Sequence, residues 1–367
     1  MRILLLGGTG AMGTSLKDIL AERGDEVYIT SRSRHIDIGS IHYLLGDAHD
    51  DEFIENVLRQ KWDTIVDFMI YRSGEFTEKV VRFLDSTDQY VFTSSSRVYA
   101  DSKEPLTEDS PRLLDVCKDE DYLKSDEYAL AKAREENVLF QGKQKNWTII
   151  RPYITYNVER LQLGTVEKDL WLYRALHGKS IVLPKDVAVH QTTMTYGGDV
   201  ATAIAGLIGN EKALGEAFHI TGKEHTAWSD VLNIYSNALK AGTGNESKIY
   251  MPNNSVNLAG VMGNTTQVVY DRLYDRVFDN TKLIAAIGEM PFITMEDGLS
   301  RCLTEFIKHP RWIDYPDPKM EAYLDKKSCA GPDLKEFHGR RKIKYFGWYY
   351  IPGIMKLAKR TKTLLHI

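Results

Sequence analysis

The chain has 367 residues, of which 43% are hydrophobic and 27% charged, a composition ordinary for a globular protein of one or two domains. No window approaches the roughly 18 consecutive apolar residues of a membrane span, and the first apolar run ends at Gly7, too early for a secretory signal. Three cysteines without CxxC spacing exclude a disulfide framework and give no zinc-ligand pattern. We therefore expect a cytoplasmic protein with reduced thiols and no metal.

The net charge of -4 is unevenly distributed. Residues 339–367 carry eight Lys or Arg and no acid, which leaves a net charge of -12 for the rest (-4 minus +8). Nucleic-acid-binding proteins normally show a basic face. The acidic body therefore makes nucleic acid an unexpected partner.

Short apolar runs alternate with amphipathic segments along the first 150 residues. The runs are rich in Val, Ile, Leu, Phe and Tyr, which is typical of buried strands. We predict strands at 2–6, 26–30, 41–45, 64–68, 89–93 and 147–150, and helices at 11–23, 50–60, 74–85 and 125–140. This alternation predicts an α/β fold, a doubly wound parallel sheet of the Rossmann type with helices on both faces.

Beyond residue 151 the pattern changes to longer helical stretches, at 166–177, 201–209, 228–241 and 295–308. We expect a dinucleotide-binding domain at 1–155, to which 190–210 returns, and a smaller, mostly helical substrate domain at 156–320. The polar, Pro-containing stretch 312–336 predicts a linker or extended strap. The remaining part, 321–367, is interpreted as this linker followed by a basic and aromatic tail.

A glycine-rich segment follows the first predicted strand directly. Glycines at 7, 10 and 13 permit a tight turn, close approach of a pyrophosphate and close packing of the next helix on the strand. Because a strand precedes them and a helix follows, the pattern predicts a dinucleotide site. The expected contacts in this segment are Gly7, Thr9, Gly10, Ala11, Met12 and Gly13.

The GxxGxxG spacing resembles that of the extended short-chain dehydrogenases/reductases, the superfamily of the NAD-dependent nucleotide-sugar epimerases and dehydratases. Further matches follow in family order over roughly the first 200 residues. They are Gly46-Asp47 after the third strand, the Ser-bearing run 90–99, the segment 105–111, the YxxxK pair Tyr128 and Lys132, and Ile150-Arg151-Pro152.

Tyr128 and Lys132 are one helical turn apart and project from the same face, so the ammonium favours the phenolate and Tyr128 can act as general acid/base. The resemblance implies a catalytic serine in the run 94–96, and counting back from Val98-Tyr99 favours Ser95. Its hydroxyl would hydrogen-bond the substrate oxygen, while a nicotinamide exchanges hydride at the adjacent carbon.

Cofactor choice depends on the end of the second strand, where an acid would bind the ribose of NAD. This chain has Ser31 and Arg32 there, which suit the 2′-phosphate of NADP, so NADP is favoured over NAD. An Arg32 that stacks on adenine or points to water is the alternative. The remaining expected cofactor contacts are Asp47, Ala48, Asp67, Phe68, Met69, Thr93, Ser94, Tyr128, Lys132, Pro152 and Tyr153.

The substrate class rests on the resemblance. The segment 195–201 is similar to the V-x-D-D-V-A segment of nucleotide-sugar epimerases, but Gly197 and Gly198 depart from it. Ile154 stands where many members place an Asn that contacts the diphosphate. Ser96 and Arg97 replace the acids of the 4,6-dehydratases, which disfavours dehydration. The expected substrate contacts are Ser96, Arg97, Tyr156, Asn157 and Arg160.

The resemblance thus implies an NAD(P)-dependent 4-epimerase or 4-ketoreductase of a nucleotide-activated sugar, acting as a homodimer. Two other functions are open: a non-catalytic NADP-sensing or RNA-associated Rossmann protein, supported by the basic aromatic tail, and a reductase of a non-sugar ketone, supported by Ile154.

The tail itself predicts an amphipathic helix after Pro352, with Ile354, Leu357, Thr361, Leu364 and Leu365 on one side. Such a helix fits an anionic membrane surface at the inner face of the membrane. It also fits docking on the body of the protein or on a sister subunit.

Overall fold

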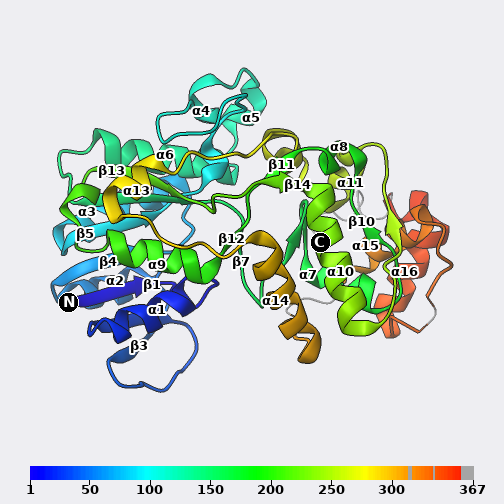
Figure 1. Cartoon of the computed structure of the whole chain (residues 1–367), viewed down its shortest axis with the longest axis horizontal. Coiled ribbons are helices and arrows are strands. Elements are labelled where there is room, and N and C mark those ends of the chain that lie inside the picture. The colour runs from blue at the N-terminus through cyan, green and yellow to red at the C-terminus, as the bar shows by residue number, and fades with distance from the viewer. Residues whose placement is uncertain (313–315, 334, 357–367) are drawn as a thin grey trace. The chain divides into compact units, whose positions relative to one another are not determined.

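The computed structural model describes residues 1–312, 316–333 and 335–356, and it divides into two compact units (Figure 1). Unit 1 comprises Met1–Arg160, His190–Ala227 and Leu273–Cys302. Unit 2 comprises Leu161–Val189, Trp228–Arg272 and Leu303–Ile367. The stretch 273–302 thus belongs with the first unit, although the sequence placed it in the substrate domain.

Unit 1 is built on a seven-stranded sheet in which every neighbouring pair is parallel. The strand order is β13-β6-β5-β4-β1-β2-β3, which contains the 3-2-1-4-5-6 order of the Rossmann fold. The predicted α/β class is therefore confirmed, while β13 was not predicted. The strands are β1 (Arg2–Leu6), β2 (Glu26–Ser31), β3 (Ile41–Leu45), β4 (Trp62–Asp67), β5 (Thr87–Thr93), β6 (Trp147–Pro152) and β13 (Glu216–Ile220).

Side chains alternate between the two faces of this sheet, as the two-residue period of a strand requires. Ile3 and Leu5 pack in a layer with α1 (Gly13–Glu22), α9 (Gly197–Leu207) and α13 (Thr281–Ile287). Leu4 and Leu6 pack on the other face, which is covered by α2 (Asp51–Leu58), α3 (Ser73–Asp85) and α6 (Tyr128–Gln141). Figure 1 shows α1 and α9 side by side, away from α6. Both faces are therefore buried.

Short elements of unit 1 follow the strands. Two of them bear on the site, because they follow β5 and β6 and carry predicted site residues: the 3-10 turn η1 (Ser96–Val98) and β7 (Thr155–Tyr156). The others are α4 (Leu113–Val116), α5 (Glu120–Lys124), β11 (Gln191–Thr192), β12 (Thr195–Tyr196), η2 (Glu211–Ala213) and β14 (Thr226–Ala227).

Unit 2 is mostly helical, which confirms the predicted helical C-terminal region. Its small sheets pair β8 (Gln162–Leu163) with β9 (Val166–Glu167), and β10 (Ile181–Val182) with β15 (Ile249–Tyr250). Its helices are α7 (Lys168–Leu176), α8 (Lys185–Ala188), α10 (Trp228–Thr243), α11 (Ser255–Met262), α12 (Thr265–Gln267), the π-turn η3 (Val268–Arg272), α15 (Pro318–Lys327) and α16 (Gly339–Tyr350). The helix α14 (Met295–Lys308) begins in unit 1 and ends in unit 2.

The stretch expected to be a linker contains the helix α15. Its start is well specified, because the Asp317 side chain accepts hydrogen bonds from the backbone N–H groups of Lys319 and Met320, and Pro318 occupies the first helical position. This Asp-Pro signal outweighs the polar composition on which the linker prediction rested. Helix α15 then packs against α16.

The sequence predicts a terminal helix after Pro352. In the structure residues 352–356 are helical. Leu357, Thr361, Leu364 and Leu365 lie outside the described residues. Among the residues that are described, no helix combines the length and the apolar content needed to cross a membrane.

Candidate functional site

The glycine loop leaves open space at the start of α1. Gly7 has a φ of +70°, and its N–H donates to the Thr30 hydroxyl at 3.0 Å, which ties the loop to the end of β2. A Cβ added at Gly13 would lie 2.4 Å from the carbonyl oxygen of Gly8, so this glycine is required for close packing. A Cβ added at Gly10 would meet nothing within 4 Å. The loop therefore leaves room where the helix N-terminus favours an anion.

A cavity of about 390 Å³ opens beside this loop. Eight predicted cofactor contacts line it: Gly7, Thr9, Ser31, Arg32, Asp47, Ala48, Phe68 and Met69. Five further residues complete the lining: Thr30, Ser33, Gly46, His49 and Ile70. Arg32 is exposed and makes no ion pair with any described residue. Among the lining residues, Asp47 is the single acid, and its carboxylate accepts from the His49 N–H at 3.0 Å.

Three consecutive serines follow β5, and their hydroxyls differ in availability. Ser94 donates to Glu136 at 2.6 Å, and Ser96 donates to the Arg151 carbonyl at 2.7 Å. Ser95 instead accepts from the Arg97 N–H at 3.2 Å, and its own proton has no acceptor among the described residues. The predicted contacts of Ser94 with a cofactor and of Ser96 with a substrate are therefore not made by free hydroxyls. Ser95 alone of the three can donate to a substrate oxygen.

Tyr128 is the first residue of α6, the helix that packs against η1. It is half-buried, and its hydroxyl has no hydrogen-bond partner in the described part of the chain. The Arg97 guanidinium lies 5.3 Å from the centre of the Tyr128 ring and is held by Glu127 at 2.6 Å. The positive groups beside the Tyr128 ring are therefore the Arg97 guanidinium and the N-terminus of α6.

Lys132 lies in a buried network. Its ammonium, in a residue that is 2% exposed, donates to Glu135 at 2.9 Å and to the Met69 carbonyl at 3.4 Å. Burial raises the pKa of Glu135 to about 7, although Lys132 opposes this shift. The second carboxylate oxygen of Glu135 is buried without a partner among the described residues. Burial also raises the pKa of Asp67, which accepts hydrogen bonds from the Tyr90 hydroxyl at 2.6 Å and the Tyr71 hydroxyl at 2.9 Å.

The end of β6 carries an unusual backbone conformation. Ile154 has a φ of +35°, which is rare for a β-branched residue and suits an Asn better. Pro152 is half-buried, and Tyr153 is 2% exposed, with its ring centre 5.5 Å from that of Phe278. The hydroxyl of Thr93 is buried and has no partner among the described residues. The last residue of β5 thus carries a buried hydroxyl without a partner among the described residues, and a strained backbone bend follows β6.

The predicted substrate residues do not gather at one place. Tyr156 is 1% exposed and packs so closely that a Cβ added at Gly298 would clash with its hydroxyl. The Asn157 side chain accepts from the N–H groups of Glu159 and Arg160, both at 2.9 Å, and so shapes a turn. Arg160 itself is exposed. The structure places Arg97, by contrast, against Tyr128.

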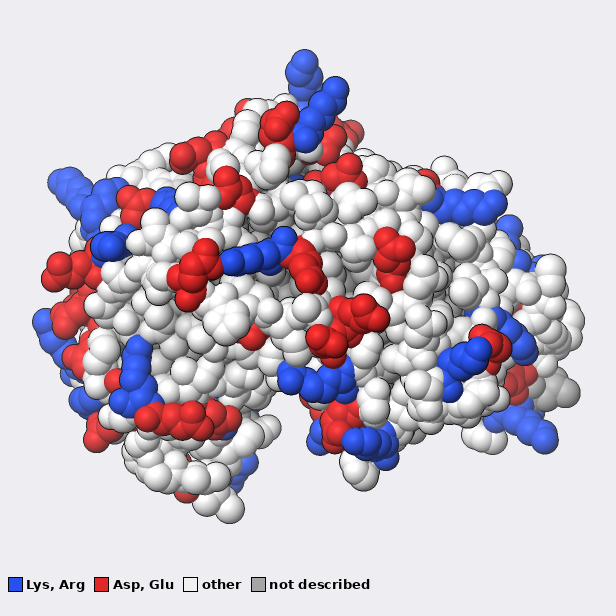
Figure 2. Space-filling model, viewed as in Figure 1, with Lys and Arg blue, Asp and Glu red and all other residues white. Residues whose placement is uncertain are grey.

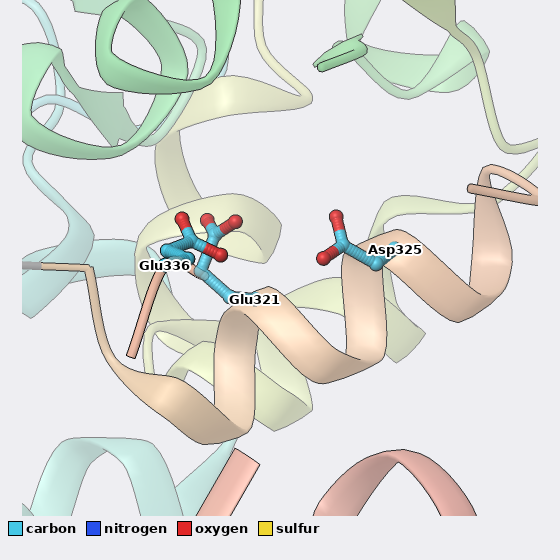
Figure 3. A group of neighbouring side chains, drawn as sticks. All are labelled: Glu321, Asp325 and Glu336. Carbon is cyan, nitrogen blue, oxygen red and sulfur yellow. The ribbon is translucent and has the colours of Figure 1, made fainter. Parts of the chain in front are cut away.

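Unit 2 holds a second buried group of acids. Oxygens of Glu321, Asp325 and Glu336 lie within 4.8 Å of one another, and Figure 3 shows Glu321 and Glu336 together with Asp325 one turn further along α15. Two cations are already paired with these three acids. Arg174 contacts Glu321 at 2.6 Å and Asp325 at 2.9 Å, and Lys179 contacts all three acids. This arrangement is an ion-pair network between α15 and the region of α7.

The chain was compared with protein families, with curated proteins and with solved structures. No family model matches it. The chloroplast stem-loop binding protein of 41 kDa b from Arabidopsis thaliana is 28% identical over 253 residues, which are 65% of this chain and 63% of that protein.

Solved structures match over more of the chain. An epimerase from Methanothermobacter thermautotrophicus has a TM-score of 0.64 at 17% identity and covers 84% of this chain and 94% of its own. The UDP-glucuronic acid 4-epimerase of Bacillus cereus, solved with UDP-glucuronic acid and NAD, has a TM-score of 0.62 at 15% identity over 85% of this chain and 100% of its own. A dTDP-glucose 4,6-dehydratase from Bacillus anthracis, solved with NAD, has a TM-score of 0.63 at 17% identity, covering 85% and 98%. The chain has the fold of the extended short-chain dehydrogenases/reductases.

On this dehydrogenase/reductase fold, the sequence reasoning missed Glu135 and several residues of the cavity wall. Glu135 had a signal, because it follows Lys132 by three residues, a spacing at which opposite charges meet on a helix. No sequence signal points to His49, because it lies in the loop after β3 and lines the cavity only in the folded structure. The network around Lys132 could therefore have been found in part from the sequence.

Proposed function

We propose that this chain is an NAD(P)-dependent enzyme that acts on a hydroxyl or keto group of a nucleotide-activated sugar, as a 4-epimerase or a 4-ketoreductase. The observation that carries the proposal is the pair of available hydroxyls on adjacent elements. The Ser95 hydroxyl has a proton to donate, and the Tyr128 hydroxyl has no hydrogen-bond partner among the described residues. The Arg97 guanidinium and the N-terminus of α6 lie beside the Tyr128 ring. Such hydroxyls are what acid/base catalysis at a carbonyl requires.

Each residue has a distinct task in this mechanism. The Ser95 hydroxyl donates to the substrate oxygen and orients it toward Tyr128. The phenol oxygen of Tyr128 takes up the proton of a substrate hydroxyl, or returns it to a ketone. The phenolate is the form of Tyr128 that takes up this proton, and the neutral phenol is the form that returns it. The positive groups beside the Tyr128 ring are Arg97 and the N-terminus of α6. Lys132 adds positive charge one turn further along the helix, and Glu135 fixes the position of that charge.

The residues of unit 1 fit a nicotinamide dinucleotide. The open space over Gly10 suits a pyrophosphate, the cavity lined by Arg32 and Asp47 suits an adenosine, and the unpaired Thr93 hydroxyl offers a further polar contact. Once bound, the nicotinamide would accept or return a hydride at the carbon that bears the reacting oxygen. Two of the similar structures contain NAD. In this chain Arg32, which is exposed and makes no ion pair with any residue that the structure describes, favours NADP.

A nucleotide sugar is the substrate class that the similar structures support, since one of them was solved with UDP-glucuronic acid. Dehydration is disfavoured because Ser96 is buried and Arg97 is a cation, so neither position offers the acid/base pair that removal of water needs. Epimerisation or reduction of a ketone remains.

The base of the nucleotide is the most informative first measurement. Calorimetric titration of the protein, loaded with NADP or NAD, with UDP, GDP, CDP and dTDP should show one clear preference. The matching sugar nucleotides are then supplied, and the sugar products are followed by NMR together with nicotinamide absorbance. Failure of all four diphosphates to bind would rule out a nucleotide sugar and would favour a ketone without a diphosphate.

The cofactor site has its own test in two glycines. Gly10→Ala should leave the unfolding temperature unchanged, because the added Cβ meets no protein atom, and should weaken dinucleotide binding about tenfold or more. Gly13→Ala should lower the unfolding temperature itself, because its Cβ collides with the backbone of Gly8. Equal dinucleotide affinity in Gly10→Ala and the wild type would contradict a pyrophosphate at this loop.

A second candidate function is stem-loop binding, which the name of the curated relative favours. The face drawn in Figure 2 gives it little support, since Lys and Arg mix there with Asp and Glu among the described residues. Gel-shift titration with an RNA hairpin at two salt concentrations separates the two functions. Tight, salt-dependent binding that survives Tyr128→Phe, combined with no turnover of any sugar nucleotide, would favour the stem-loop function.

A further inference from the structure

The helix α16 in unit 2, labelled in Figure 1, has two different faces. Its inner face is anchored: Tyr345 is fully buried and its hydroxyl donates to Asp325 at 2.8 Å. Its outer face exposes apolar side chains, with Ile343 73% and Tyr350 59% exposed. These two residues are seven apart and therefore lie on one side of the helix. Ile351 and Ile354, 49% and 63% exposed, extend the apolar surface beyond the helix end.

Cations surround this apolar line. Arg340 lies one turn before Ile343, and Lys342 and Lys344 lie on either side of it along the helix. Lys344 is paired with Asp317 at 3.1 Å, which leaves Arg340 and Lys342 as the cations of this face without an acidic partner among the described residues. No acidic residue occurs between Phe337 and Lys356. Long Lys and Arg side chains can keep their charged ends in a polar layer while apolar neighbours sit deeper. A central apolar line with flanking cations is the pattern of a helix that lies in a membrane interface.

We propose that the outer face of α16 and the exposed residues that follow the helix bind an anionic membrane surface. This surface is formed by Arg340, Lys342, Ile343, Tyr350, Ile351 and Ile354. The cations contact the lipid phosphates and carboxylates, and the three isoleucines enter the boundary between headgroups and acyl chains. This contact is independent of the reaction proposed above, because every residue of the face belongs to unit 2 and the catalytic residues belong to unit 1.

The aromatic side chains argue against a nucleic acid as the partner of this face. Base stacking needs exposed rings beside cations. Tyr345 is buried, Lys319 lies 5.4 Å from the Trp348 ring centre, and Lys326 lies 5.9 Å from that of Tyr349. These three rings are thus turned toward α15. Tyr350 is the exposed ring of the outer face, and it already stacks on Phe346 with the ring centres 5.9 Å apart, so the face is otherwise aliphatic.

A second copy of the chain is also a poor partner. A two-fold contact brings the same patch of both copies together, so Arg340 and Lys342 of one copy would face the same cations of the other. Anionic lipid removes this repulsion and supplies the complementary charge.

The test is co-sedimentation of the full chain with vesicles of phosphatidylcholine alone or mixed with phosphatidylserine. We expect sedimentation with the mixed vesicles alone, decreasing as salt screens the contact. Arg340→Gln/Lys342→Gln should weaken binding about fivefold for each cation removed. Ile343→Ser/Ile354→Ser should abolish the binding that remains at high salt.

Matched controls come from unit 1. Ile36 and Ile38 are 84% and 70% exposed, and Ile36→Ser/Ile38→Ser should leave sedimentation unchanged. Arg59→Gln/Lys61→Gln removes two exposed cations elsewhere and should do the same. Equal sedimentation with neutral and mixed vesicles would overturn the proposal. Two other results would also overturn it. One is that the Ile343→Ser/Ile354→Ser variant abolishes a dimer seen in light scattering while vesicle binding persists. The other is that this variant abolishes binding to an RNA hairpin while vesicle binding persists.

Discussion

Glu135 in unit 1 and Glu321 in unit 2 have nearly the same electrostatic setting. Both are fully buried, and burial raises the pKa of each to about 7. Each contacts a buried cation, Lys132 at 2.9 Å and Arg174 at 2.6 Å, and each keeps one carboxylate oxygen without a partner among the described residues. The pKa values alone do not distinguish them.

Their neighbours do distinguish them. Lys132 contacts the carbonyl of Met69, a residue of the cavity wall, and lies one helical turn from Tyr128. The network of Glu321 ends on the Tyr345 hydroxyl through Asp325, and so joins α15 to α16. A raised pKa therefore locates a buried charge, and an adjacent cavity with an available hydroxyl is what indicates chemistry.

Removing the hydroxyl of Tyr128 gives the largest expected effect. In Tyr128→Phe we expect turnover to fall about 10²–10⁴-fold, because the proposed general acid/base is lost. The unfolding temperature should not change, since the hydroxyl has no hydrogen-bond partner among the described residues. Dinucleotide affinity should stay largely intact, because Tyr128 is one of many expected cofactor contacts. Turnover is measured with the sugar nucleotide that the titrations select.

The control is Tyr122→Phe. Its hydroxyl donates to Glu127 at 3.0 Å, so its loss should cost stability of about 1 kcal/mol and leave most turnover intact. If both variants lost turnover to the same extent, Tyr128 would have a structural role in place of a catalytic one.

Breaking the unit 2 network should affect stability alone. Arg174→Met leaves Glu321 and Asp325 buried with one cation fewer, and we expect a loss of about 3–5 kcal/mol in the free energy of unfolding. Chemical denaturation measures it, and dinucleotide affinity of the folded fraction should be unchanged. Lys308→Met, which breaks the exposed pair with Glu305 at 3.2 Å, is the control and should cost less than about 1 kcal/mol. If Arg174→Met weakened dinucleotide binding, the Glu321 network would also serve the cofactor site, and the distinction from the Glu135 network would be wrong.

Arg32 provides a smaller, selective effect. Arg32→Ala should weaken NADP binding about 10–100-fold, since a charge-assisted hydrogen bond contributes about 1.5–3 kcal/mol. NAD affinity should stay nearly constant. Arg34→Ala, an exposed cation that does not line the cavity, should alter neither affinity. Calorimetry with both dinucleotides decides, and an equal loss for NAD would show that Arg32 stacks on adenine.

The sheet was predictable because its signals are local. Each of the first six strands contains a short apolar run, and β1 and β3 have the predicted ends. The seventh strand, Glu216–Ile220, was missed because its pairing with β6 joins residues far apart in the chain. The return of 273–302 to unit 1 is equally non-local.

The site residues that belong to a sequence motif could be predicted. The residues whose role depends on packing could not. Ser95 could be chosen from spacing, but the reason that Ser94 and Ser96 are engaged lies in Glu136 and the Arg151 carbonyl. Tyr156 was read as a substrate contact, yet it packs against Gly298, a close approach that no local pattern records.

The pH dependence of stability gives the smallest expected effect, but it tests the comparison of Glu135 with Glu321 most directly. The ordinary pKa of a glutamate is 4.5, and burial raises that of Glu135 and Glu321 to about 7, so the folded protein binds more protons than the unfolded chain between these values. Stability contributed by the protonated forms is thus complete below about pH 4.5 and is lost as the pH rises through about 7.

Glu135→Gln and Glu321→Gln should each flatten this decline, on the order of 1–2 kcal/mol, in denaturation series from pH 5 to 8. Glu305→Gln, an exposed carboxylate, is the control and should leave the slope unchanged. The pH profile of turnover separates the two buried acids: Glu135→Gln should shift it, because Lys132 loses its counter-ion near Tyr128, whereas Glu321→Gln should not. A shift in the Glu321 variant would mean that burial in unit 2 also serves the reaction.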